Sequence, residues 1–174
     1  MLGSIIGDFA GSCYEFGSPK RTDFVLFPAH AEITDDSILS IATAEVLLGN
    51  GDYRKLYQQF ALLYPEPMGG YGLRFQQWAR TKDAPPYNSW GNGSAMRVGP
   101  VGLAKHAEEE VLSEATLSAS VTHDHPEGIK GAQATALTVF MARTGVSKEN
   151  IRSTIATRFG YDMDRTVERI RPSY

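Results

Sequence analysis

Two adjacent carboxylates open an apolar stretch in "TDDSILSIATAEVLLG", residues 34–49. Thr34, Asp35 and Asp36 place three oxygen-bearing side chains in a row, and oxygen ligands are those that Mg²⁺ prefers. Magnesium commonly binds through only one or two carboxylates and keeps several waters. The same residues suit a helix N-terminus, with Thr34 as N-cap and each aspartate stabilised by the helix dipole by roughly 0.3–1 kcal/mol. The pattern therefore indicates either a divalent-cation site or a capped helix start.

A lone glutamate, Glu15, ends the small and apolar segment "GDFAGSCYE". A glutamate in this position is either a solvated helix end or, where it faces a cleft, a general base or a group that orients water.

Gly3, Gly7 and Gly11 recur at a spacing of four, which on a helix forms a smooth ridge that another backbone can approach closely. The spacing predicts a buried helix over residues 1–16.

The stretch "SWGNGSAMR" gathers glycine, asparagine and serine at a predicted helix start. Free N–H groups and the helix dipole at such a point suit a phosphate group. The stretch lacks the third glycine of a dinucleotide fingerprint and the lysine of a phosphate-binding loop, so ordinary turn chemistry explains it equally well. Trp90 could stack on a flat ring of a ligand or serve only in packing.

Four side chains that could bind a metal or a ligand crowd into "THDHPEG": His123, Asp124, His125 and Glu127. Zinc is disfavoured because a spacing of two suits a strand, a fourth ligand is absent nearby and cysteine ligands are lacking. A neutral His123 that donates to a ligand hydroxyl or phosphate is the functional interpretation. Capping of a helix by Asp124 ahead of Pro126 is the structural one.

The elements that must position these side chains are predicted to be helices. Apolar spacing, capping residues and prolines predict them over residues 34–48, 52–64, 71–80, 108–120, 127–143 and 147–159. A further helix follows Ser94 and is kinked or interrupted at Pro100, and a last one starts at Asp162 or Asp164. No segment sustains the period-two alternation of a strand. The fold class is therefore all-α.

Composition narrows the function classes. At 174 residues, with 42% hydrophobic and 21% charged residues, the chain fits a single globular domain over residues 1–174. The formal charge of −3 and the lack of a basic cluster argue against nucleic acid as a partner. The absence of a G-x-S-x-G motif disfavours a serine hydrolase.

The sequence also predicts a cytoplasmic setting. Cys13 is the single cysteine and cannot form an internal disulfide, and no signal peptide is evident. Asp8 and Glu15 interrupt the apolar N-terminal segment well short of a bilayer span, so no membrane partner is expected.

In order along the chain, four motifs resemble those of the ADP-ribosylglycohydrolase family, which includes dinitrogenase-reductase-activating glycohydrolases and ADP-ribosyl-acceptor hydrolases. The motifs are "GDFAGSCYE" at 7–15, "TDDS" at 34–37, "GNGSAMRVGPVG" at 91–102 and "THDHPEGIKGA" at 122–132. Each motif is modest alone, but the ordered set is specific. The resemblance runs from residue 3 to about residue 174 and implies a compact, orthogonal, all-α multi-helix domain.

The resemblance also implies roles for individual residues. Thr34, Asp35 and Asp36 would be ligands of one or two magnesium ions, while Glu15 and Asp35 would be the catalytic carboxylates near the scissile bond. Candidate substrate-binding residues are Gly91, Asn92, Gly93, Ser94, Met96 and His123, which match the loop around the ribose and diphosphate and the ligand-contacting histidine. The implied substrate is an ADP-ribosylated protein or small molecule, whose acceptor these residues do not identify.

One departure from the family stands out. The later Asp-x-Asp-Thr segment that completes the two-metal site is absent, and "YDMDRT" at 161–166 resembles a different family segment. We therefore expect a truncated member that lacks the C-terminal helices, such as a natural fragment, a degraded gene product or one half of a split enzyme. Its activity would be impaired by an incomplete second metal site, or it would be a noncatalytic ADP-ribose-binding module. A homo-oligomer or a complementing chain would cover an exposed apolar face.

Overall fold

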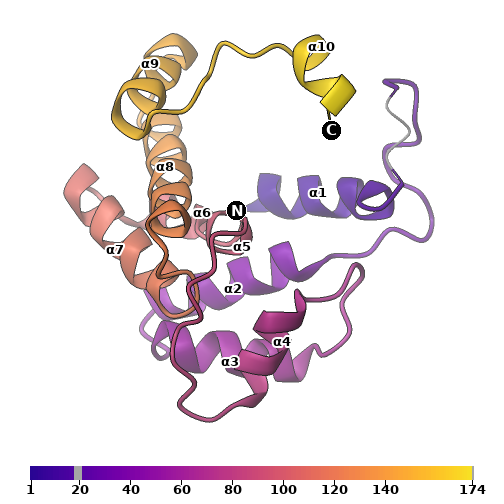
Figure 1. Ribbon diagram of the computed structural model, residues 1–174, viewed down its shortest axis with the longest axis vertical. Helices are drawn as coiled ribbons and strands as arrows, with labels where there is room; N and C mark the ends of the chain where they lie inside the picture. The colour runs from indigo at the N-terminus through magenta and orange to yellow at the C-terminus, as the bar shows by residue number, and fades with distance from the viewer. Residues whose placement is uncertain (18–20, 174) are drawn as a thin grey trace.

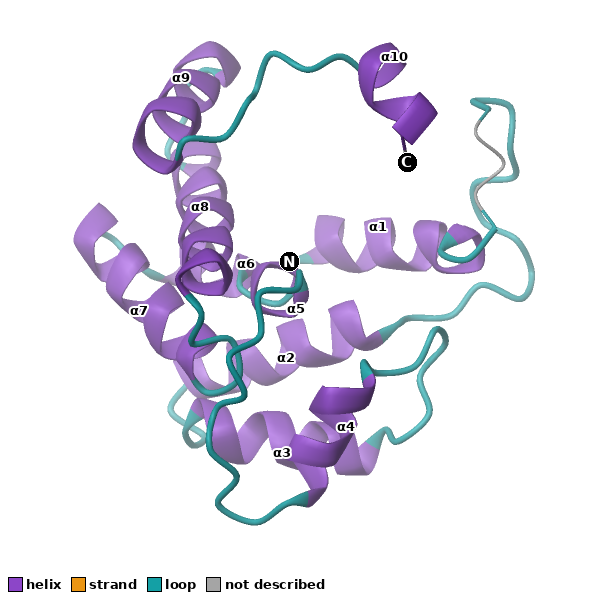
Figure 2. Cartoon of the chain, viewed as in Figure 1, coloured by secondary structure: helices purple, strands orange, loops and turns teal. Residues whose placement is uncertain are grey.

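The computed structural model describes residues 1–17 and 21–173. Over these residues it contains helices, turns and loops, with no strand beyond an isolated bridge between Thr34 and Met68 (Figure 2). The α-helices are α1 (Leu2–Gly11), α2 (Asp35–Leu47), α3 (Tyr53–Leu63), α4 (Leu73–Arg80), α5 (Gly93–Met96), α6 (Gly99–Ala104), α7 (Glu108–Ser120), α8 (Pro126–Arg143), α9 (Lys148–Phe159) and α10 (Val167–Ile170). Short 3₁₀ turns follow α1 and α10 at Ser12–Tyr14 and Arg171–Ser173. The predicted all-α class is confirmed.

Local capping chemistry explains where several helices begin. The side chains of Thr34, Asp52 and Ser147 accept hydrogen bonds from backbone N–H groups in the first turns of α2, α3 and α9. Such caps satisfy donors that a helix cannot pair internally, so the start of the helix is encoded by nearby residues. The helix predicted after Ser94 is split into α5 and α6, and Pro100 lies in the first turn of α6, where its missing N–H costs nothing.

Two groups of helices form the core. Helices α2, α3 and α4 pack around apolar residues that include Leu39, Tyr57 and Trp78. Helix α8 packs against α5, α6, α7 and α9, and its buried alanines and Leu137 lie in the two other apolar clusters. Contacts of α2 with α6 join the groups, so that α5 and the loop before it lie between them (Figure 1).

Helix α1 differs from the prediction. The glycine ridge indicated a buried helix, but α1 contains no buried residue, and a Cβ added at Gly3, Gly7 or Gly11 would meet nothing within 4 Å. Leu2 and Ile6 are 76% and 54% exposed. The prediction of a buried helix was wrong because a ridge of small residues permits close packing without supplying the element that packs there.

The segment that follows α9 carries the motif "YDMDRT", residues 161–166. In Figure 1 the connection from α9 to α10 lies on the far side of α1 from α2. Asp164 in this connection pairs with Arg152 of α9. The motif at 161–166 therefore lies apart from the residues that open α2. Over the described residues, no helix is long and apolar enough to cross a membrane.

Candidate functional site

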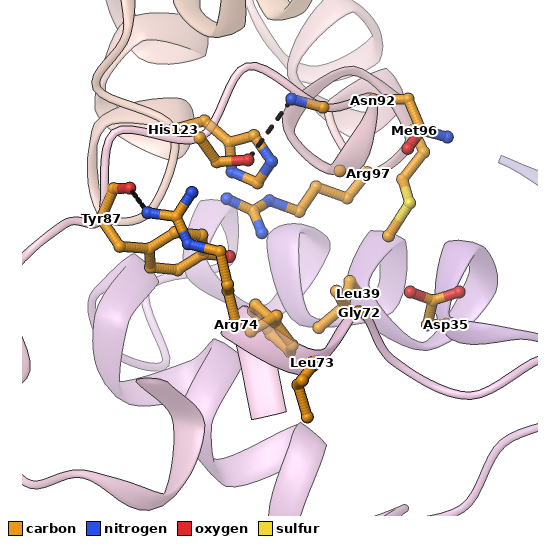
Figure 3. A pocket seen from close by; sticks show the side chains of 14 residues that line it. Asp35, Leu39, Gly72, Leu73, Arg74, Tyr87, Asn92, Met96, Arg97 and His123 are labelled. Atoms are coloured by element: carbon orange, nitrogen blue, oxygen red, sulfur yellow. Dashed lines mark hydrogen bonds between the residues drawn. The ribbon is translucent and has the colours of Figure 1, made fainter. Parts of the chain in front are cut away.

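A cleft of about 330 Å³ lies between α2, the start of α4 and the loop that leads into α5. This volume is within the range of small-molecule sites, roughly 300–1,000 Å³. Figure 3 shows Asp35 at one end of the cleft and Arg74, Tyr87 and His123 at the other. The two ends are described below as the acidic end and the basic end.

Asp35, in the first turn of α2, dominates the acidic end. Burial raises the pKa of its carboxyl group to about 7, and the negative charges of Asp36 and Glu15 add to this effect. Burial also raises the pKa of Asp36, with further contributions from Asp8 and Glu15. Four carboxylates therefore act on one another at the start of α2, and none forms an ion pair with another described residue.

Asp8 connects α1 to the acidic end through hydrogen bonds. It was not among the predicted site residues. Its carboxylate accepts hydrogen bonds from the backbone N–H and hydroxyl of Thr34, at 2.9 and 2.6 Å. It also accepts from the N–H and hydroxyl of Ser37, at 3.2 and 2.5 Å. Asp8 thus caps α2 from another helix, across 26 residues of sequence. The only signal in the sequence was a single aspartate within an apolar segment.

The three predicted metal ligands lie close together but face different spaces. The Thr34 hydroxyl donates to Asp8 and accepts from the N–H of Asp36, which confirms its role as N-cap. Asp35 lines the main cleft, whereas Asp36 lines a smaller cavity of about 150 Å³ beside Asp8. Met96 lines both spaces and lies between them.

The protein side chains do not by themselves form a closed metal cage. Within residues 1–17 and 21–173, no group of three or more His, Cys, Asp or Glu side chains is placed to hold a metal ion. Their chemistry nevertheless suits Mg²⁺, because this ion binds hard oxygen ligands and is often held by one or two carboxylates together with waters. The magnesium assignment for Thr34, Asp35 and Asp36 stays a prediction.

Glu15 is exposed and follows the 3₁₀ turn Ser12–Tyr14. Its carboxylate lies against the backbone of Gly69, where a Cβ would clash with Oε2 of Glu15. Gly69 also has φ of +79°, a conformation that favours glycine. Glu15 is not among the side chains that line the cleft, but it is close enough to raise the pKa of both Asp35 and Asp36.

The glycine loop forms one wall of the cleft. Gly91, Asn92, Gly93 and Met96 line it, together with His123, so the structure brings five of the predicted substrate-binding residues to one cleft. The sixth, Ser94, is buried, and its hydroxyl donates to the carbonyl of Gly128 at 2.8 Å. That side chain fastens α5 to α8 and does not line the cleft.

Arg97 lies beneath the basic end and is fully buried. Its guanidinium stacks on the ring of Tyr57, 4.0 Å from the centroid, and its Nη2 donates to the carbonyl of Ser118 and the hydroxyl of Thr122. Nε and Nη1 have no hydrogen-bond partner within the described part of the chain. Sequence reasoning included Arg97 only as the end of the loop, because its burial depends on helices far away in sequence.

Two further residues complete the basic end. Arg74 of α4 donates to the carbonyl of Tyr87, and its guanidinium lies 4.9 Å from the centre of the Tyr87 ring. Burial lowers the pKa of His123 to about 4, with a further contribution from the positive charge of Arg97. His123 is therefore neutral at pH 7, as its proposed role required, whereas Arg74 had not been predicted as a site residue.

The comparisons with known proteins agree with the motifs. The sequence model of the ADP-ribosylglycohydrolase family matches residues 1–172. The chain belongs to this family.

Among the curated relatives, the ADP-ribosylhydrolase ARH3 of Mus musculus is 29% identical over 182 residues, which cover 84% of this chain and 49% of the relative. ARH3 of Bos taurus is 29% identical over 186 residues, with 84% and 49% covered. ARH3 of Homo sapiens is 28% identical over 186 residues, with 84% and 50% covered. The chain thus spans about half the length of the curated relatives it matches.

Proposed function

We propose that the chain binds ADP-ribose in the cleft between α2, α4 and α5 and takes part in hydrolysis of the glycosidic bond that joins ADP-ribose to an acceptor. The observation that carries this proposal is the arrangement of one cleft with the Asp35 carboxylate at one end and a neutral histidine, an arginine and a glycine loop at the other. ADP-ribose has a matching division, because its diphosphate is anionic and its terminal ribose presents hydroxyl groups. Membership of the family and similarity to proteins named ADP-ribosylhydrolase support the same activity.

In this arrangement the basic end takes the diphosphate. Arg74 supplies a positive charge, His123 supplies a neutral polar group, and the loop at Gly91 and Gly93 allows the ligand to approach the backbone closely. The fixed position of Arg74 against Tyr87 means that little side-chain freedom is lost on binding.

The acidic end takes the terminal ribose and the scissile bond. Hydrolysis of a glycosidic bond passes through an oxocarbenium-like transition state, and its positive charge is stabilised by nearby carboxylates. Glu15 or Asp35 positions the attacking water and accepts its proton.

Magnesium is the cofactor that these donors fit best. Thr34, Asp35 and Asp36 would hold it, because burial and the repulsion between neighbouring carboxylates, which together raise the pKa of Asp35, favour a nearby cation. When bound, the ion supplies positive charge that orients the sugar hydroxyls and a water molecule.

The test measures release of ADP-ribose from arginine-linked and serine-linked ADP-ribosylated proteins by the purified chain. We expect release in millimolar magnesium and its loss on addition of EDTA. If no substrate is cleaved, the hydrolytic part of the proposal fails. If ADP-ribose also fails to bind in calorimetry, the assignment of the cleft fails with it.

A noncatalytic ADP-ribose-binding module is the second candidate. It is favoured by the basic end, where Arg74, His123 and the glycine loop can bind the diphosphate without a metal ion. Calorimetry separates the candidates, because binding of ADP-ribose without turnover of any modified substrate supports the module and turnover rejects it.

A further inference from the structure

We infer that Arg97 and Thr122 are positioning residues that hold His123 in the tautomer with its proton on Nε2, so that the ring donates a hydrogen bond into the cleft. The part of this inference that concerns a ligand rests on the proposed function, whereas the tautomer itself is a property of the free protein. Neither Arg97 nor Thr122 needs to touch the ligand for this role, and both are fully buried.

The direction of the hydrogen bonds follows from the chemistry of the three groups. Arg97 Nη2 lies 2.8 Å from Thr122 Oγ1, and Thr122 Oγ1 lies 2.7 Å from His123 Nδ1. A guanidinium only donates, so Thr122 Oγ1 accepts from Arg97. The hydroxyl has one proton left to donate, and His123 Nδ1 is the acceptor that the described residues place within its reach.

The opposite tautomer would leave the Thr122 proton without an acceptor. If Nδ1 carried the proton and donated to Thr122, the hydroxyl would accept twice and its own proton would be buried and unpaired, which is costly. A neutral imidazole that accepts at Nδ1 carries its proton on Nε2. The Arg97–Thr122–His123 chain therefore specifies one tautomer.

The other edge of the ring faces the cleft. His123 lines the cleft, and its Cε1–Nε2 edge lies against Gly93, where an added Cβ would be 3.0 Å from both atoms. Among the described residues, no hydrogen bond to Nε2 is formed. A phosphate or hydroxyl oxygen of a ligand in the cleft can therefore accept from Nε2.

The surroundings of His123 also keep its imidazole ring neutral. Burial and the positive charges of Arg97 and Arg74 lower the pKa of His123, whereas the negative charge of Asp124 raises it, and the net value is about 4. Tyr87, whose ring centroid lies 6.0 Å from that of His123, has a raised pKa and is neutral in the same range. The ring thus offers the same donor from about pH 5 upward.

The direct test is ¹⁵N NMR of the histidine side chains in the free protein at about pH 7. The spectrum of a His123→Asn variant assigns the signals of His123. We expect wild-type His123 to show a protonated Nε2 and an unprotonated Nδ1. Thr122→Ser keeps the hydroxyl and should keep this tautomer, while Thr122→Val should give a mixture of both tautomers. Thermal unfolding of both variants checks that they are folded.

Calorimetry with ADP-ribose provides the second readout. We expect Thr122→Val to weaken binding by about twofold, because an equal mixture of tautomers halves the fraction of His123 that can donate from Nε2, and Thr122→Ser to match the wild type. A wild-type His123 protonated on Nδ1, or charged at neutral pH, overturns the inference without the need for any variant. A Thr122→Val variant with a changed tautomer and unchanged affinity overturns the ligand-directed role. Absence of ADP-ribose binding to a wild type with the expected tautomer rejects the proposed function, and supports the positioning by Arg97 and Thr122.

Discussion

The two ends of the cleft differ in whether their charge depends on pH. At the acidic end, Asp35 has a pKa near 7 and lies among other carboxylates, so its charge depends on pH and on any cation nearby. At the basic end, Arg97 is permanently charged and fully buried, and His123 is held neutral. Within the described residues, no ion pair links the two ends or neutralises either of them. The basic end thus holds its charge without a cation, whereas we propose that the acidic end is completed by one.

Asp35→Asn tests the acidic end most severely. We expect the hydrolytic rate and the affinity for magnesium to fall by more than the roughly 10- to 100-fold that loss of an outer-shell partner costs a metal site. The affinity for ADP-ribose in EDTA should change little, because the basic end is intact. Rate measurements and calorimetry with magnesium check this. An active Asp35→Asn variant would contradict the division of roles between the two ends.

The free energy of unfolding in EDTA should depend on pH through the acidic end. The pKa of Asp35 is raised from 3.8 to about 7 on folding, so the native state holds this proton more tightly. Its contribution is therefore present below about pH 4 and is lost as pH rises to about 7, at up to about 1.4 kcal/mol per pH unit. Asp36, with a pKa raised in the same direction, adds to the slope.

Urea unfolding between about pH 5 and about pH 8 measures this dependence. The control is Asp35→Asn, which keeps the opposite contribution of His123, whose lowered pKa adds stability as pH rises to about 6.5, so the difference between the two proteins isolates Asp35. Added magnesium should stabilise the wild type more at the higher pH, because the metal competes with protons for the same oxygens. A wild type that gains more stability than Asp35→Asn as pH rises would contradict the raised pKa.

Asp8→Ala tests how much the hydrogen bonds of Asp8 stabilise the start of α2. The substitution removes the acceptor of the N–H and hydroxyl groups of Thr34 and Ser37, and should lower the free energy of unfolding by about 2 kcal/mol. Ile6→Ser, also on α1 but exposed, should stay within about 0.5 kcal/mol of the wild type. Urea unfolding compares them. An equal loss in Ile6→Ser would indicate that a second copy or another chain covers α1 in solution.

Gly93→Ala probes the basic end with the smallest expected effect. Its Cβ would lie 3.0 Å from Cε1 and Nε2 of His123, so the ring must shift by a few tenths of an ångström. We expect the affinity for ADP-ribose to fall by about tenfold, or about 1.4 kcal/mol, with no loss of stability, since alanine favours a helix over glycine. Gly91→Ala is the matched control, because its Cβ would meet Ser89 Oγ at an ordinary 3.7 Å. Calorimetry of both variants decides the matter, and equal affinities would show that the ring position is unimportant.

Much of the fold and part of the site could be predicted because the relevant interactions are local. Thr34, Asp52 and Ser147 cap helices through bonds to groups two or three residues away, and those helix starts agree with the structure. The loop at Gly91 and Gly93 was recognised for a similar reason, since glycine and asparagine at a helix start are visible within a few residues.

The parts of the site that were not predicted depend on interactions between segments far apart in sequence. Asp8 was missed because its four bonds reach residues at least 26 positions away. Arg97 and Arg74 were missed as parts of the basic end because their partners lie on other helices and loops. The glycine ridge of α1 misled for the converse reason, since packing needs a partner that the ridge itself does not specify.

The helical class, the positions of most helix ends and the four family-like motifs could all be predicted without a structure, because capping, helical periodicity and motif order depend on residues close together in the chain. Three features could not be predicted in that way: Asp8 caps α2, Asp35 and Asp36 line different cavities, and Arg97 lies buried behind His123. Burial and electrostatic interactions arise where helices pack against one another, and that packing depends on the whole fold.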